Sequence, residues 1–162
     1  MKLFYLAIFL MGLAVSAVGQ NSIREGLKVN GLALGATYAQ TIKTFGKPVR
    51  DITSRKIDEC IGSRTRTLTY LGLKVELVEG ERNAFTVFGF EVTSAKWNVS
   101  GIRIGESSEL IQRRFGTTGR TVEREKTGQT WFYEMTEESP GGTSFYFRNG
   151  KLIKVNTGYE MC

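Results

Sequence analysis

The sequence predicts an α+β fold in which short helices pack on one joined antiparallel sheet. The first observation is a repeat at a spacing of 70 residues: residues 29–37 align without a gap on residues 99–107, and a Phe-Gly pair follows at 45–46 and at 115–116. The second observation is that stretches with the two-residue alternation of strands follow each copy. We therefore expect a tandem repeat of one short helix plus about four antiparallel strands.

The first 19 residues are typical of a secretory signal peptide. Lys2 supplies a positive charge, residues 3–15 form an apolar run, and the small residues at 16–19 suit a signal peptidase. We expect cleavage before Gln20, with cleavage before Val18 as an alternative, and export to the periplasm or the extracellular space. The apolar run is shorter than the about 20 residues that span a bilayer, so an uncleaved anchor is disfavoured and no integral span is expected after processing.

The first unit is expected to span residues 20–97 and to begin with a helix whose two ends can be recognised. Thr37 can cap the helix, apolar residues at 38, 42 and 45 fall at helical spacings, and Gly46 can end it. Pro48 then prevents continuation of the helix. The expected strands cover residues 49–57, 64–71, 73–78 and 85–93. A turn near residue 80 is expected to join the last two.

The second unit, residues 98–162, follows the same order. Ser107 can cap a helix, Ile111 and Phe115 lie one turn apart on one face, and Gly116 can end it. The pair Asn149-Gly150 is the clearest hairpin signal, because both residues tolerate the positive φ of a type I′ turn. The expected strands cover residues 121–126, 130–135, 143–148 and 151–157.

Two pairs of residues are candidates for links across the chain. Cys60 and Cys162 are the only cysteines, and in an oxidising compartment we expect them to form a disulfide, with two free thiols as the alternative. The bond would close a loop of about 100 residues and contribute about 4 kcal/mol in the loop-entropy treatment. Trp97 and Trp131 could anchor the seam between the units or serve as independent core residues.

The pattern apolar-x-apolar-Gly-x-Ser/Thr, leading into a short helix that ends in Phe-Gly and is followed in the first copy by Lys-Pro, resembles the repeat unit of the beta-lactamase-inhibitor-protein-like superfamily. The resemblance directly covers residues 29–48 and 99–118. It implies an exported protein that packs helices on an antiparallel sheet and works by binding proteins. The resemblance makes outer-membrane assembly lipoproteins of the SmpA/OmlA type, which belong to that superfamily, distant relatives. It does not imply their assembly role, because this chain lacks their N-terminal lipid-attachment Cys and carries Ala36 and Glu106 where Met is usual.

The absence of histidine disfavours several chemistries. Triad-type hydrolases use an imidazole base, and most zinc, copper and non-haem iron sites use imidazole ligands. We therefore expect no catalytic residues, no metal and no cofactor. Glu123 and Glu125 leave a carboxylate-type hydrolase as an alternative, which is disfavoured because Arg120, Arg124 and Lys126 would hold both carboxylates ionised.

Aromatic residues are candidates for binding a partner. Neighbouring residues of a strand point to opposite faces, so the aromatic residues of the strands cannot all enter one core. We expect some of Phe88, Phe132 and Tyr146 to lie on the other side of the sheet, where exposed rings are favoured anchors in protein interfaces. Cover by loops or by the N-terminal segment is the alternative.

Cationic residues form a second candidate surface. The formal charge is +6, or +5 once Lys2 leaves with the leader, so an anionic envelope component is a possible partner. If the units are related by a pseudo-twofold axis, their cations could combine into one patch, although ordinary solvated charge is the favoured interpretation. The candidate residues of this patch are Arg50, Arg55, Arg113, Arg114 and Arg120.

Together these features predict an exported, noncatalytic binding module with a protein partner, in the cell envelope or secreted. A structural envelope protein that binds anionic lipid or a cell-wall polymer is the alternative, and nucleic acid is not an expected partner.

Overall fold

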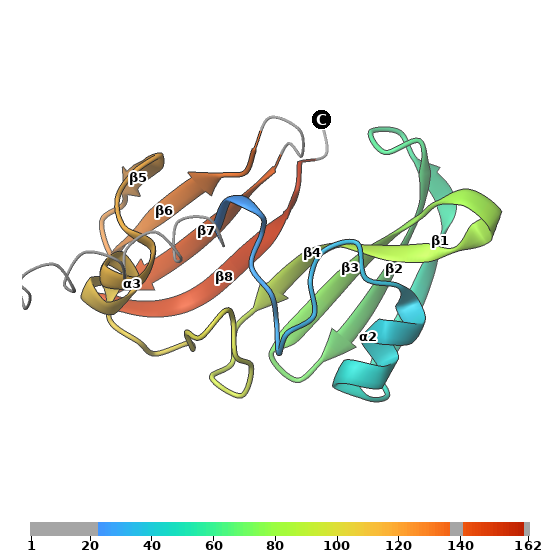
Figure 1. Ribbon diagram of the computed structural model, residues 1–162, viewed down its shortest axis with the longest axis horizontal. Helices are drawn as coiled ribbons and strands as arrows, with labels where there is room; N and C mark the ends of the chain where they lie inside the picture. The colour runs from blue at the N-terminus through green and yellow to red at the C-terminus, as the bar shows by residue number, and fades with distance from the viewer. Residues whose placement is uncertain (1–22, 137–140, 161–162) are drawn as a thin grey trace, which may run out of the picture.

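The computed structural model describes residues 23–136 and 141–160 of the chain (Figure 1). Eight strands form one antiparallel sheet, and two helices, α2 (Tyr38–Phe45) and α3 (Ser108–Phe115), pack on one of its faces. The predicted α+β class and the single joined antiparallel sheet are confirmed. The expected signal peptide and Cys162 lie outside the described residues.

The strands form two meanders of four that meet in the middle of the sheet. The strand order is β1-β2-β3-β4-β8-β7-β6-β5, so β1 and β5 are the two edges and β4 pairs with β8 at the centre. We call residues 23–97 the first half and residues 98–160 the second half. In chain order the strands are β1 (Arg50–Asp58), β2 (Ser63–Tyr70), β3 (Leu73–Glu79), β4 (Phe85–Val92), β5 (Arg120–Arg124), β6 (Gly128–Glu134), β7 (Gly141–Arg148) and β8 (Lys151–Tyr159).

Both helices begin and end at the predicted residues. Thr37 forms a capping box with Gln40 at the start of α2, and the Ser107 side chain accepts a hydrogen bond from a backbone N–H in the first turn of α3. Gly46 and Gly116 end the helices with φ of 80° and 73°, conformations that favour glycine because it has no Cβ.

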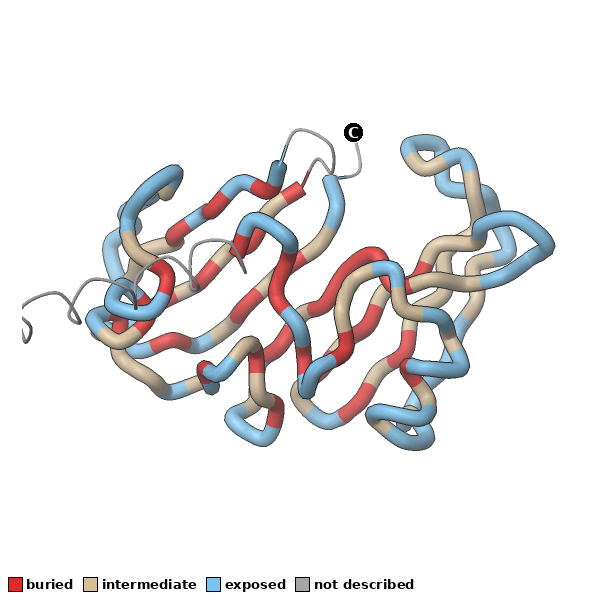
Figure 2. The backbone as a smooth tube through the Cα atoms, in the orientation of Figure 1, coloured by how far each residue is buried: buried red, intermediate tan, exposed pale blue. Residues whose placement is uncertain are grey.

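The β7–β8 hairpin has the predicted turn. Asn149 and Gly150 have φ of 49° and 71°, as a type I′ turn requires. Between β3 and β4 the chain forms a short 3-10 turn, η1 (Glu81–Asn83), close to the turn expected near residue 80. Figure 2 shows buried positions alternating with more exposed ones along the central strands, which is the pattern of a sheet with one covered face.

The segments that lead into the two helices meet each other at the centre of the molecule. Val29 and Val99 form an antiparallel bridge, flanked by backbone hydrogen bonds of 2.8 and 2.9 Å that Asn30 and Ser100 donate. Figure 1 shows the blue N-terminal segment running across the sheet near the junction of β4 and β8. Both valines are fully buried, so the contact belongs to the core.

The N-terminal segment of the first half packs on the second half, whereas Trp97, at the end of the first half, packs within its own half. The backbone N–H of Leu27 donates to the Thr157 hydroxyl of β8 at 3.3 Å. The Trp97 indole donates to the carbonyl of Leu71 at 2.9 Å and packs edge-on against Phe45, with ring centroids 5.5 Å apart. The buried apolar residues accordingly form one continuous cluster with members from both halves.

The two tryptophans differ in what they connect. Trp97 follows β4 in sequence but is part of the packing between α2 and the first meander, so it ties the start of the second lead-in to the first half. Trp131 packs on Phe147 of the neighbouring strand, with centroids 4.5 Å apart, and is a core residue of the second half.

Candidate functional site

Among residues 23–136 and 141–160, no helix packs on one face of the sheet, and the strand register decides which side chains stand there. In β3 the buried residues Leu73, Val75 and Leu77 belong to the core, so Lys74 and Glu76 point to the opposite side. Both helices pack on the core side. We call the opposite side the open face.

The three aromatic candidates lie on the open face. Phe132 stands opposite Ser144, between strand neighbours that enter the core, and is 38% exposed. Tyr146 stands beside Lys154, whose ammonium nitrogen lies 4.0 Å from the ring centroid. Phe88 occupies a β-bulge opposite β3 and lines a hollow of this face; it is only 7% exposed, although it is not part of the core cluster.

A row of glycines produces this hollow at the centre of the open face. Gly89, Gly158 and Gly142 stand side by side on β4, β8 and β7. Because they carry no side chains, a depression of about 320 Å³ remains above the sheet. A Cβ on Gly142 would overlap the Phe132 ring, so this ring borders the depression. Charged and polar residues around it include Lys74, Glu76, Glu91, Ser144, Asn156 and Tyr159.

The charges around the hollow occur in pairs. The Lys74 ammonium lies 2.6 Å from the Glu76 carboxylate, and the hydrogen bond between them raises the pKa of Lys74. Lys154 lies 3.9 Å from Glu91. The amide oxygen of Asn156 is buried and has no hydrogen-bond partner among the described residues. The surroundings of the hollow are therefore polar and nearly neutral, with aromatic rings on one flank.

The five cationic candidates do not form one surface. Arg50 and Arg55 lie on β1, whereas Arg113 and Arg114 lie on α3 and Arg120 begins β5. Because β1 and β5 are opposite edges of the sheet, the two groups lie at opposite ends of the molecule (Figure 1). The expectation of one combined patch is therefore wrong.

Two of these arginines are also engaged within the molecule. The Nε of Arg114 donates to the Ser100 carbonyl at 2.9 Å. The Arg120 guanidinium lies 4.1 Å from the centroid of the Trp131 ring. These contacts give both side chains a structural role.

The two carboxylates considered for hydrolysis do not converge. β5 ends at Arg124, so Glu125 belongs to the turn after the strand, and both Glu123 and Glu125 are exposed. A shallow hollow of about 280 Å³ at this turn is lined by Glu125 and not by Glu123. Among the described residues, no cluster of potential metal ligands is found.

A polar junction on the helix side was not singled out from the sequence. The Arg66 guanidinium donates two hydrogen bonds of 2.7 Å to Asp51, and the Tyr38 hydroxyl donates to the same carboxylate at 2.9 Å. Arg66 also stacks 3.8 Å from the centroid of the Tyr38 ring. The bonds from Arg66 lower the pKa of Asp51, and the bond to Asp51 raises the pKa of Tyr38. The only sequence signal is the excess of cations near these positions.

No helix in residues 23–136 or 141–160 is both long and apolar enough to cross a membrane.

Comparison with known proteins gives a fold likeness only. No family model matches the chain, and no curated protein matches its sequence. A cysteine-rich secretory protein from Staphylococcus aureus subsp. aureus Mu50 is 14% identical with a TM-score of 0.52, over 88% of this chain and 49% of that one. An extracellular protein containing a SCP domain, from Bacillus anthracis str. Ames, is 16% identical with a TM-score of 0.49, over 79% and 44% of the two chains.

This chain therefore spans less than half the length of these two solved structures. A candidate beta-lactamase inhibitor protein from Streptococcus mutans is also similar, with 16% identity and 88% and 95% coverage, but its TM-score of 0.32 is too low to carry an argument. At these identities, the likeness to the Staphylococcus aureus protein shows the arrangement of the fold alone.

Proposed function

We propose that the mature chain is an exported, noncatalytic module that binds another protein through the open face of its sheet. The observation that carries this proposal is the exposed Phe132 ring beside the glycine hollow, on the face that no helix of the described part of the chain covers. A partly exposed ring next to a depression is the arrangement of an interface anchor and its neighbouring pocket.

The composition of the open face suits a reversible protein interface. Paired lysines and glutamates surround the depression, and such a polar rim keeps a free surface soluble. Above Gly89 and Gly158 a partner side chain could approach the sheet closely, because no Cβ stands there, whereas the Phe132 ring covers Gly142. Phe132, Tyr146 and Phe88 would supply the aromatic contacts.

Export is part of the same proposal. The leader-like residues 1–19 support it, and the two longer solved structures are described as secretory and extracellular. A disulfide between Cys60 and Cys162 would fit an oxidising compartment.

We also propose that the two halves are copies of one ancestral unit. Matching contacts support this view: Val29 bridges to Leu32 as Val99 bridges to Ile102. The tyrosine of the second strand of each meander donates its hydroxyl hydrogen bond to the carbonyl of the glycine that ends the helix, at 3.2 Å in the first half and 2.8 Å in the second.

Site-specific photocrosslinking of the full chain in its native envelope tests the binding proposal. A benzoylphenylalanine at position 132 is expected to capture one protein in stoichiometric yield. The control is the same group at Leu71, a residue that is 78% exposed in the β2–β3 turn and outside the open face. Equal capture from both positions, or capture from neither, would count against the proposal.

Once that protein is purified, Phe132→Ala is expected to weaken its binding by about tenfold or more. The competing hypothesis of an anionic lipid or polymer predicts a different result. Vesicles containing phosphatidylglycerol would then retain the mature chain at low salt and release it as the salt concentration rises.

A further inference from the structure

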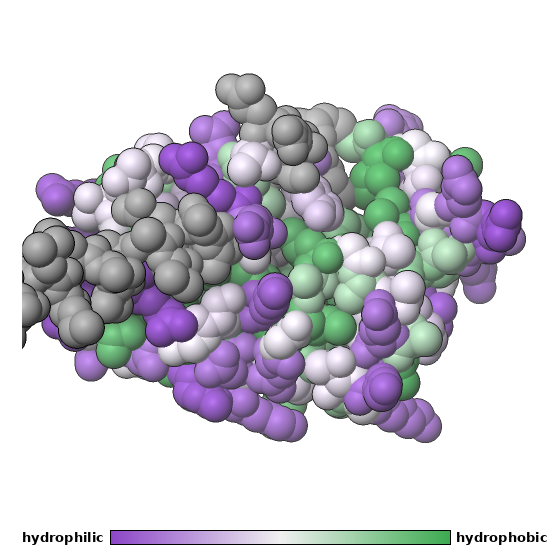
Figure 3. All heavy atoms as spheres, viewed as in Figure 1, coloured by the Kyte–Doolittle hydropathy of each residue, from purple (hydrophilic) through white to green (hydrophobic). Residues whose placement is uncertain are grey.

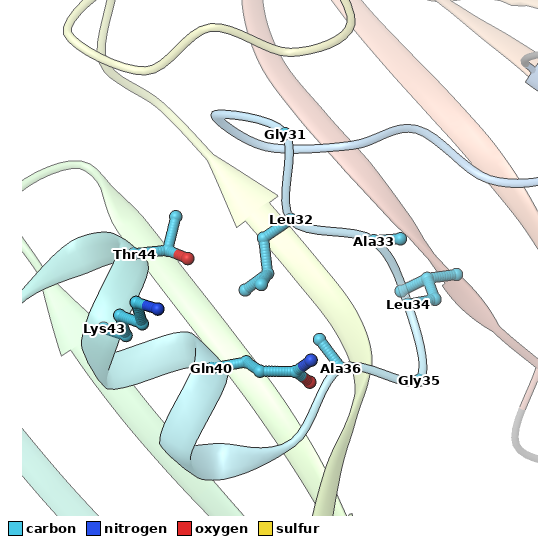
Figure 4. A pocket seen from close by; sticks show the side chains of 9 residues that line it. All are labelled: Gly31, Leu32, Ala33, Leu34, Gly35, Ala36, Gln40, Lys43 and Thr44. Atoms are coloured by element: carbon cyan, nitrogen blue, oxygen red, sulfur yellow. The ribbon is translucent and has the colours of Figure 1, made fainter.

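The two halves differ at a hollow beside the start of each helix. In the first half, a hollow of about 660 Å³ that is open to solvent lies between residues 31–36 and α2. Figure 4 shows Leu32, Ala36 and Gln40 pointing into the space between the segment and the helix, with Lys43 and Thr44 on the helix wall. In Figure 3, hydrophobic residues gather near the middle of this side of the molecule, within a rim of hydrophilic ones.

The backbone around the corresponding place in the second half is the same. Gly35 donates to the carbonyl of Val87 at 2.7 Å, and Gly105, 70 positions later, donates to the carbonyl of Leu152 at 2.8 Å. Both donors follow a similar bridged turn. The difference between the two places therefore comes from side chains.

In the second half, an arginine occupies this space. The Nε of Arg114 donates to the Ser100 carbonyl at 2.9 Å, and its guanidinium lies so close to Gly101 that a Cβ there would overlap it. Ser100 is in the left-handed conformation, with φ of 49°, which presents its carbonyl to the helix side. Arg114 makes this contact although another cation, Arg113, stands next to it on α3.

In the first half, Thr44 stands where the second half has Arg114. A Cβ on Gly31 would have nothing within 4 Å, so the corresponding space is open. Asn30, the counterpart of Ser100, has the same left-handed backbone, with φ of 46°. Within the described part of the chain, no hydrogen bond to the Asn30 carbonyl is found.

We propose that this hollow of the first half receives an arginine side chain of a protein partner, which makes from outside the contact that Arg114 makes within the second half. The guanidinium would donate to the Asn30 carbonyl, and the methylene stem would cover Leu32 and Ala36. The site lies on the helix side of the sheet, so it does not depend on the open face binding a partner.

Titration of the isotope-labelled full chain with N-acetyl-L-arginine amide tests the proposal by NMR. Saturable shifts are expected at the amides of Gly31, Gly35 and Thr44, in the millimolar range. N-acetyl-L-lysine amide carries the same charge without the planar fork, and its binding is expected to be weaker by about threefold or more. The absence of a saturable shift at these amides, or equal binding of the two compounds, would overturn the proposal.

Two variants that exchange Thr44 and Arg114 between the halves test whether the arginine side chain decides if the hollow is open. Thr44→Arg should fill the hollow and abolish the shifts at Gly31 and Gly35, whereas Thr44→Ser should retain them. In the second half, Arg114→Thr should open a matching hollow and produce new shifts at Gly101 and Gly105. Thermal unfolding of each variant shows whether it is folded. Folded Thr44→Arg that still binds like the parent chain would contradict the assignment.

Discussion

At the scale of single residues, Arg66 organises the junction between α2 and the first strands. Its guanidinium holds the Asp51 carboxylate with two hydrogen bonds and stacks on the Tyr38 ring, so one side chain of β2 touches β1 and the helix together. The ion pair is only partly exposed, with about a quarter of each side chain accessible, 24% for Arg66 and 27% for Asp51. Its contribution is therefore expected at the upper end of the range for surface pairs.

Asp51→Asn is expected to lower the free energy of unfolding by about 1 kcal/mol near neutral pH. Because the folded state lowers the pKa of Asp51, the contribution of this carboxylate is present above its unfolded pKa, about 4, and is lost as the pH falls through the folded pKa. The stability difference between the parent chain and the variant should thus shrink in acid. Urea unfolding at about pH 7 and about pH 2 measures this change.

Glu81→Gln is the matched control, because Glu81 is exposed in η1 and forms no ion pair with another described residue. It should leave the stability at both pH values within about 0.5 kcal/mol of the parent chain. A difference between Asp51→Asn and the parent chain that stays constant down to the acid end would contradict the role given to the ion pair.

At the scale of elements, each helix is fixed at its C-terminal end by a tyrosine from the meander that it covers. The hydroxyl of Tyr70 donates to the Gly46 carbonyl and that of Tyr133 to the Gly116 carbonyl. Burial raises the pKa of Tyr70 to about 12 and also raises that of Tyr133. These bonds satisfy carbonyl groups at the helix ends, which have no partner within the helix itself.

Tyr70→Phe and Tyr133→Phe are each expected to cost about 1 kcal/mol, because each removes one partly buried hydrogen bond. The raised folded pKa of Tyr70 means that its contribution is present below the unfolded pKa, about 10, and is lost as the pH rises through about 12. Tyr70→Phe should therefore lose less stability than the parent chain between mild and strong alkali. Thermal unfolding across that range measures it, and Tyr159→Phe, at an exposed tyrosine, is the control.

The elements themselves were predictable because their signals are local. Every strand begins and ends within two residues of its expected bounds. The two signals, alternation of apolar residues along a strand and turn residues such as Asn149-Gly150 between strands, each depend on only a few neighbouring positions. The end of β5 was overestimated: the strand stops at Arg124, and Glu125 turns back to bond Gly128. A strand over residues 121–126 would have placed Glu123 and Glu125 on one face, whereas the observed strand contains only Glu123.

At the scale of the whole molecule, the strand order decides where residues of the two halves lie relative to each other, which the sequence pattern does not predict. Cations that occupy similar places in the two halves end at opposite edges because β4 pairs with β8 and not with an edge strand. The glycine hollow needs the register between the β7–β8 hairpin and β4, which is far from it in sequence, so no local pattern indicates it. The placement of Phe132 followed from alternation alone.

The proposed disulfide acts at this scale, since it would join the β1–β2 turn, where Cys60 lies, to the last residue of the chain. We expect the mature protein to be 2 Da lighter than its reduced form by mass spectrometry, the mass of the two hydrogens lost in oxidation. Its reduction should lower the free energy of unfolding by up to about 4 kcal/mol. The double variant Cys60→Ser, Cys162→Ser should show the lower stability without any effect of reductant. An unchanged mass on reduction would show that the thiols are free.

The contacts between the two halves predict that the halves unfold together. Leu27 of the first half bonds to β8 of the second, and the buried Val29 bridges to the buried Val99, so neither half can lose its structure without exposing core residues of the other. The chain has two tryptophans, and each reports on one half. In Trp97→Phe the fluorescence of Trp131 follows the second half, and in Trp131→Phe the fluorescence of Trp97 follows the first. Within each variant, the urea midpoint from fluorescence should coincide with the midpoint from far-ultraviolet circular dichroism, which reports on both halves. A fluorescence midpoint that departs from the circular dichroism midpoint in either variant would mean that the halves are separate folding units and that the contact between Val29 and Val99 does not couple them.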